Sequence, residues 1–159
     1  MHPKLRRLAV TAAAAALATA SLAALAQQAP KPEQLIKWRQ SAFQVVAWNA
    51  GRIKASLDGG YNKDEVIRAS NAIAAIAGSG LGGLFAPGTE QGKGWHDTAA
   101  KPELFQDGAK AAERAGEFNK EAAELAKVAA NGDPAAVKAQ FAKLNRTCKG
   151  CHDDFRRID

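Results

Sequence analysis

Apolar residues recur along most of this chain at steps of three and four, and clusters of Gly, Pro, Asn and Asp divide the recurrence into four segments. The alternation of apolar and polar residues that marks a strand is nearly absent. The first predicted helix begins near Pro32 and ends near Leu57, before the run DGGYN. The second begins after Asn62, which is placed to cap it, with Glu65 three residues later as in a capping box. The chain is therefore predicted to be all-α.

A third helix is predicted from about Pro102 to Asn131, and a fourth begins at Asp133, which is placed as its N-cap. Between the second and third helices lies a stretch of about twenty residues, LGGLFAPGTEQGKGWHDTAAK, with many glycines and no helical period. A loop of that length in a compact helical domain is usually functional.

Three of the predicted helices carry a seven-residue repeat of core-type positions. In the first helix these positions are Ile36, Arg39, Phe43, Val46, Ala50, Ile53 and Leu57. In the third they are Leu104, Gly108, Ala111, Ala115, Phe118, Ala122, Leu125 and Ala129, and in the fourth Val137, Phe141, Leu144, Cys148, Cys151, Phe155 and Ile158. Such stripes, joined by short connections, predict a left-handed antiparallel four-helix bundle.

The first 26 residues are set apart by a basic start and an alanine-rich apolar run that ends in the pattern Ala24-Leu25-Ala26. They predict a secretory signal peptide, cleaved before Gln27, and hence a periplasmic protein; an uncleaved membrane anchor is the alternative. Cleavage would leave residues 27–159, enough for one domain. The signal holds three of the 22 basic residues and none of the 16 acidic ones, so the net charge falls from +6 to +3. That charge is too mild to predict binding to nucleic acid or to a membrane.

Both cysteines of the chain lie in one C-x-x-C-H pentad, Cys148 to His152, on the core stripe of the fourth helix. Two thiols three residues apart lie side by side on a helix, and this pentad is the attachment sequence of haem c, whose iron the histidine can reach. A thioredoxin-like dithiol would need a preceding strand, and a zinc site would need further ligands, whereas His96 stands alone in the loop. Covalent haem c is the prediction.

Two further residues bear on that prediction. Arg39 interrupts the apolar stripe of the first helix, so it either extends to solvent near the helix start or meets an internal anion, for which a haem propionate is the candidate. Met1 is the only methionine and lies in the predicted signal, so a Met–iron bond is excluded. His96, a lysine, water or nothing is left as the sixth ligand.

With these residues in view, the chain resembles the cytochrome c-prime family of class II c-type cytochromes over essentially the whole of 27–159. The resemblance is carried by KWRQSAF, LFAPGTEQG and AKPELF and, most specifically, by TCKGCHDDFR. It implies a four-helix bundle with one haem c. It also implies homodimers formed through the first two helices, for which Trp38, Val45 and Trp48 are suitably placed.

Several site residues are implied by the same resemblance. Those expected at the haem are Cys148 and Cys151 as thioether links, His152 as the proximal iron ligand, Arg39 and Gln40 at the propionates, Phe43 over the distal face, Arg156 beside the proximal histidine, and Thr89 and Glu90 as loop contacts.

The expected function is that of a periplasmic haem protein with five-coordinate, largely high-spin iron. Such a protein would bind nitric oxide or carbon monoxide and could transfer electrons. Whether the gas binds on the Phe43 side or the His152 side stays open. The alternative is a dedicated electron carrier for unidentified redox partners. Enzymatic activity is not predicted, because no acid or base is placed over the iron.

Overall fold

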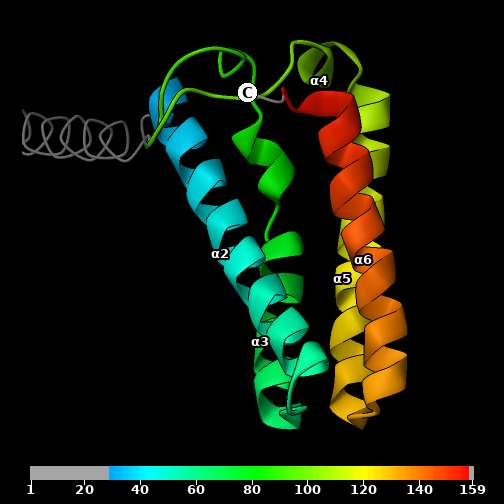
Figure 1. Cartoon of the computed structure of the whole chain (residues 1–159). Helices are drawn as coiled ribbons and strands as arrows, with labels where there is room; N and C mark the ends of the chain where they lie inside the picture. Colours follow the sequence, from blue (N-terminus) through cyan, green and yellow to red (C-terminus); the bar gives the residue numbers. More distant parts are fainter. Residues whose placement is uncertain (1–28, 158–159) are drawn as a thin grey trace, which may run out of the picture. The chain divides into compact units, whose positions relative to one another are not determined.

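The computed structural model describes residues 29–157, and its helices run up and down in an antiparallel four-helix bundle, as predicted (Figure 1). The four long helices are α2 (Pro32–Asp58), α3 (Lys63–Ala77), α5 (Gly108–Asn131) and α6 (Pro134–Phe155). Of two short elements, η1 (Leu81–Leu84) forms the start of the long loop and α4 (Glu103–Gln106) follows its end. The predicted signal peptide, its cleavage site and the stripe residue Ile158 lie outside the described residues. None of the described helices is long and apolar enough to cross a membrane.

The predicted caps form, and one of them differs in a detail. The Asn62 side chain accepts a hydrogen bond from Glu65 N at 3.0 Å, and Asp133 accepts one from Ala135 N at 3.0 Å. The Glu65 carboxylate does not complete a capping box but pairs with Arg52 of α2, Nε to Oε1 2.9 Å. The start of α3 is thereby tied to the end of α2.

The prediction of one continuous third helix is wrong, because Asp107 divides it into α4 and α5. The Asp107 N–H donates to Glu103 O at 2.9 Å and closes α4, while its carboxylate accepts from Lys110 N at 3.0 Å and caps α5. Aspartate favours an N-cap over a helix interior, and Gly108 follows it, so a break costs less here than elsewhere in the segment.

The apolar core fills the half of the bundle that holds the α2–α3 and α5–α6 connections. Its buried members are Val46, Ile53, Val66, Ala69, Ile73, Ala77, Ala122, Leu125, Ala129, Val137, Phe141 and Leu144. On α5 and α6 it thus ends before the stripe reaches Ala115 and Cys148, which keep accessible surface. In the other half the stripe positions Ile36, Arg39 and Phe155 are buried, whereas Phe43, Ala115 and the two cysteines keep accessible surface.

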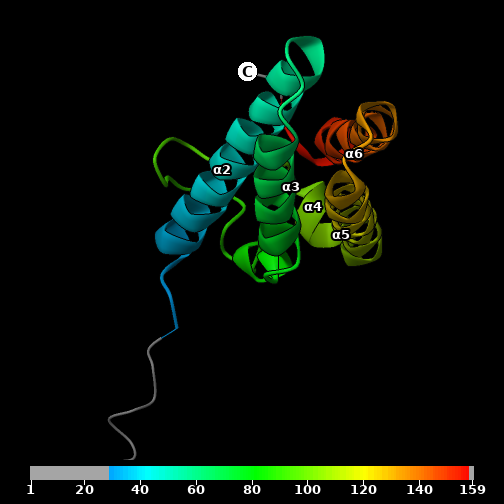
Figure 2. The same cartoon turned by 90° about the horizontal axis from the view of Figure 1, so that it is seen from below.

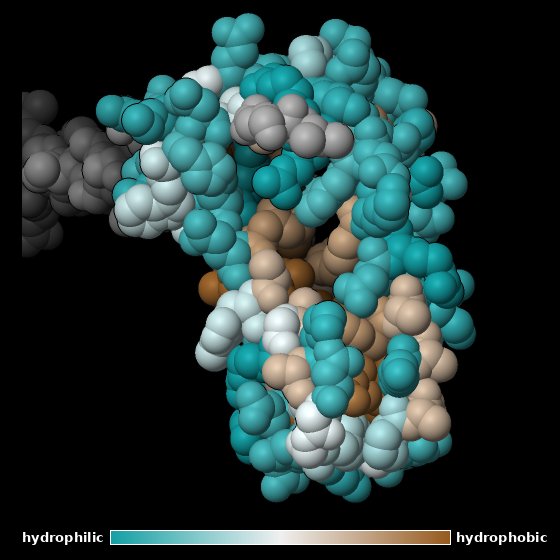
Figure 3. Space-filling model, viewed as in Figure 1, coloured by the Kyte–Doolittle hydropathy of each residue, from teal (hydrophilic) through white to brown (hydrophobic). Residues whose placement is uncertain are grey.

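Neighbouring long helices pack in chain order, α2 on α3, α3 on α5 and α5 on α6 (Figure 2). Within the described part of the chain, α2 and α6 form no comparably close pair. The face between them shows a hollow bordered by hydrophobic residues (Figure 3). The C-terminal half of α6, which carries the C-x-x-C-H pentad, belongs to this open half.

Candidate haem-attachment site

The pentad forms the last turns of α6, and its two thiols are half-buried free cysteines. Burial raises the pKa of both Cys148 and Cys151, which keeps them as neutral thiols at neutral pH. The neighbouring His152 is exposed by surface area, yet nearby protein atoms desolvate its ring enough to lower its pKa below 6.5. Repulsion from Arg156 lowers the pKa further and Asp153 opposes it, so the imidazole is in the neutral form that metals bind.

The surroundings of the pentad fit a large apolar group. Phe43 lies on the core-type stripe of α2 but is 37% exposed, and Ala111, Ala115 and Phe118 of α5 also keep accessible surface. A covalently attached macrocycle would cover apolar positions that α2 and α5 leave accessible in the half of the bundle that holds the two thiols and the imidazole. The residues present therefore fit haem c.

Arg39 is buried, with 4% of its surface exposed, and it binds the long loop. Its Nη1 donates to Leu84 O at 3.2 Å and to Thr89 Oγ1 at 2.8 Å, and its Nη2 donates to Thr89 O at 2.8 Å and Thr98 Oγ1 at 2.5 Å. Burial lowers the pKa of Arg39, and the charge of Glu90 partly offsets this effect. The alternative in which Arg39 extends to solvent is wrong, because loop hydroxyls and carbonyls surround the guanidinium.

The same contacts limit how Arg39 could meet a propionate. A guanidinium has five N–H groups, four of them on the terminal nitrogens. Both terminal nitrogens of Arg39 already donate to the loop, whereas no loop hydrogen bond is found for Nε. The propionate role stays a prediction, and Nε–H is the donor best placed to serve it without breaking the loop contacts.

Gln40 holds the tip of the loop against α2. Its Nε2 donates to His96 O at 2.9 Å, and its Oε1 accepts from Trp95 N at 2.7 Å. Gly94 is required at this contact, because a Cβ there would lie 2.7 Å from Lys37 N. The exposed His96 ring has its Nδ1 2.9 Å from Asp97 O, so this nitrogen is engaged within the loop. A contact of Gln40 with haem stays a prediction.

Phe85 is a site residue that the sequence did not reveal. Its ring lies against Phe43, with centroids 6.3 Å apart and planes tilted by 54°. The Phe85 ring also lies against Arg39, whose Cζ is 4.9 Å from the ring centroid. No periodic pattern marks residue 85, since it lies in a loop whose path depends on residues of α2.

The remaining predicted residues divide between the two sides of the open half. Thr89 is fully buried and Glu90 half-buried in the loop beside Arg39. Arg156 is exposed at the end of α6, where its N–H donates to His152 O at 3.0 Å. The structure brings Arg39, Thr89 and Glu90 together, and the roles of all three toward haem stay predictions.

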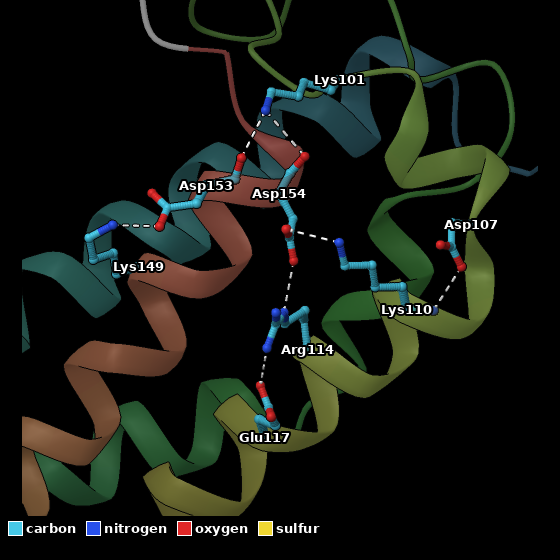
Figure 4. A network of polar contacts seen from close by, with 8 residues as sticks. All are labelled: Lys101, Asp107, Lys110, Arg114, Glu117, Lys149, Asp153 and Asp154. Atoms are coloured by element: carbon cyan, nitrogen blue, oxygen red, sulfur yellow. Dashed lines mark hydrogen bonds and ion pairs between the residues drawn. The ribbon is translucent and has the colours of Figure 1, made fainter.

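A polar network that the sequence also did not reveal ties α5 to Asp154, two residues after the pentad on α6 (Figure 4). The Arg114 Nε donates to Asp154 Oδ2 at 2.9 Å, and Lys110 Nζ lies 2.9 Å from Asp154 Oδ1. The Arg114 guanidinium also lies 3.7 Å from where a Cβ of Gly150 would stand. That separation is an ordinary van der Waals contact, so a small side chain at residue 150 would also fit beside Arg114.

Comparison with known proteins gives one consistent family. The family model described as cytochrome c′ matches residues 34–156. A cytochrome c′ of Rhodocyclus tenuis is 66% identical over 130 residues, which cover 81% of this chain and 98% of that protein. The crystal structure of cytochrome c′ from Thermochromatium tepidum is 44% identical with a TM-score of 0.79, covering 81% of this chain and 98% of that one.

Other similar structures carry information on ligands and assembly. One cytochrome c′ is described as having an unusual ligand-controlled dimer dissociation. It is 43% identical with a TM-score of 0.79, and the match covers 81% of this chain and 98% of that one. Variants of the cytochrome c′ from Alcaligenes xylosoxidans have been solved with nitric oxide and with carbon monoxide bound. They are 28% identical to this chain with a TM-score of 0.72, and the match covers 80% of this chain and 98% of theirs.

Proposed function

Because the chain belongs to the cytochrome c′ family, a family of haem proteins, we propose that it carries one haem c attached through Cys148 and Cys151. The half-buried thiols three residues apart on α6 support this attachment, and the neutral imidazole of His152 would be the proximal iron ligand. The group would supply an iron that binds diatomic gases and exchanges single electrons. The residues of the chain hold it, shape its open face and set its access to solvent.

The observation that carries the proposed function is the position of Phe43. This residue lies on the core-facing stripe of α2 and is 37% exposed at the open half of the bundle. It presents an apolar ring, whereas a methionine at this position could supply a sulfur ligand to the iron. A phenyl ring offers no lone pair to iron and no proton to a bound ligand. We therefore infer five-coordinate, largely high-spin iron that small gases such as nitric oxide and carbon monoxide can reach when the ring moves aside.

The structures of relatives with nitric oxide and carbon monoxide bound support gas binding as the function. A dedicated electron carrier is the second candidate, favoured by the haem itself. A catalytic role is not proposed, because Phe43 can serve neither as acid nor as base. The proposal includes a periplasmic location and a homodimer formed through α2 and α3.

The visible absorption spectrum of the dithionite-reduced holoprotein, before and after addition of carbon monoxide, tests this function. We expect a broad high-spin spectrum that shifts on adding the gas. Replacing Phe43 with methionine, Phe43→Met, is expected to give sharp low-spin bands and to slow or abolish the shift, because a thioether then reaches the open iron position.

Phe141→Met is the matched control, since it adds the same sulfur in the buried core of α6. It should leave the spectrum and the carbon monoxide shift unchanged. A wild-type spectrum that is already low-spin and ignores carbon monoxide would refute the five-coordinate assignment and favour the electron carrier.

A further inference from the structure

We infer that the loop residue Phe85 is a positioning residue for Phe43, and that Arg39 holds Phe85 in place, so that the pair sets how readily Phe43 yields to an entering gas. This inference rests on the proposed function, in which Phe43 covers the open face of the iron. It assigns a role to the long loop that neither the pentad nor the helical stripes require.

The rings of Phe43 and Phe85 form an aromatic pair. Phe43 projects from α2 and keeps 37% of its surface exposed, so its ring is not enclosed on every side. Phe85 is half-buried and meets it with centroids 6.3 Å apart and a tilt of 54°. This separation and tilt lie within the range of favourable aromatic pairs. Phe85 therefore occupies space into which the Phe43 ring could otherwise move.

Phe85 is in turn held in place by Arg39. The Arg39 guanidinium lies 4.9 Å from the Phe85 ring centroid, within cation–π range. The guanidinium also restrains the backbone next to that ring, because Arg39 Nη1 donates to Leu84 O at 3.2 Å. The Phe85 N–H donates to Gly82 O at 3.0 Å. The Phe85 ring is thus restrained both by the hydrogen bonds of the neighbouring backbone and by a buried cation.

Arg39 holds the loop at several points at once. Thr89 and Thr98, both nearly or fully buried, receive its remaining terminal N–H groups. Because Arg39 precedes Phe43 by about one turn of α2, the helix presents the latch and the covering ring to the same loop. A loosened latch should release Phe85 and, through it, Phe43.

The experiment measures the rate of carbon monoxide association to the reduced holoprotein after flash photolysis. For Phe85→Leu and Phe85→Ala we expect the rate constant to rise by about three- to tenfold, the size expected from losing an aromatic pair. The absorption spectrum should stay high-spin. Phe141→Leu, which removes a ring from the core at the other end of the bundle, should lower stability and leave the rate unchanged.

A second variant tests the latch with a readout that does not depend on gas. Arg39→Lys keeps the charge but loses the fork of donors, so amide hydrogen exchange over residues 84–98 should accelerate and the association rate should rise. Arg52→Lys is the matched control, because Arg52 lies on the same helix but pairs with Glu65. It should change neither measurement.

The outcomes separate this inference from the function on which it rests. Wild-type protein that binds carbon monoxide, with Phe85→Leu and Phe85→Ala at the wild-type rate, would overturn the role of Phe85. Faster exchange in Arg39→Lys with an unchanged rate would overturn the link from the latch to Phe43. Wild-type protein that binds no carbon monoxide would overturn the proposed function, and the inference with it.

Discussion

At the scale of single residues, the Tyr61 hydroxyl is expected to lower the stability of the fold, and removing that hydroxyl should raise it. Its ring packs against the core, while its buried hydroxyl has no hydrogen-bond partner in the structure. A buried polar group without a partner destabilises a protein by about 1 kcal/mol or more. Tyr61→Phe is therefore expected to raise the free energy of unfolding at pH 7 by about 1 kcal/mol in urea denaturation.

The same residue predicts a pH dependence. Burial, and then repulsion from Asp133, raises the pKa of Tyr61 above its ordinary 10.0. Since the folded state holds this proton more tightly than the unfolded chain, ionisation of Tyr61 costs no stability below pH 10.0, and stability falls as the pH rises from 10.0 through the higher pKa of the folded state. The stability advantage of Tyr61→Phe should therefore grow above pH 10.0.

Tyr61 is the only tyrosine, so its ultraviolet titration reports this hydroxyl alone. A titration midpoint at or below 10.0 in the folded protein, or a Tyr61→Phe variant less stable than wild type at pH 7, would contradict this account.

Single residues were also the hardest to predict from the sequence. The stripe identified Arg39 as a polar residue at a core position, yet its partners Thr89 and Thr98 lie 50 and 59 residues away and carry no local signal. Phe85 became visible only once the loop was folded against α2. The pentad needed no fold to be recognised, because its chemistry depends on spacing along one helix.

At the scale of elements, Asp107 should determine where α5 begins. Its carboxylate accepts from Lys110 N at 3.0 Å, so Asp107→Ala removes the cap and is expected to lower stability by about 1 kcal/mol. Asp107→Asn is the matched control and should stay within a few tenths of a kcal/mol of wild type, because asparagine caps about as well. Urea denaturation of the three holoproteins measures both values, and equal stability of Asp107→Ala and wild type would argue against the cap.

The elements show why some boundaries were predictable and others were not. The ends of α2 followed from Pro32 and the DGG run, which favour a helix start and a helix stop irrespective of tertiary contacts. The break at Asp107 lay inside a continuous seven-residue repeat, so the pattern predicted one helix where the structure has two. Periodicity reports which face is apolar and is insensitive to a cap that keeps the period.

At the scale of the whole molecule, the helical stripes predicted the bundle. The homodimer that we propose would instead be formed by surface residues outside those stripes. Three apolar residues on one side of α2 are well exposed: Trp38 at 48%, Val45 at 44% and Trp48 at 62%. Spacings of seven and three place them along one line of the helix, which suits an isologous contact between two copies. The Arg52 guanidinium lies 4.6 Å from the Trp48 ring at one end of this line.

We therefore expect the holoprotein to be a dimer in sedimentation velocity, and Val45→Glu to make it a monomer. In a two-fold contact each substitution places its charge twice at an apolar interface, so the loss of affinity should exceed about a hundredfold. Ala123→Glu adds the same charge to an exposed position on α5 and should leave the dimer intact. A wild-type monomer, or a Val45→Glu dimer of unchanged affinity, would mean that Trp38 and Trp48 serve another contact.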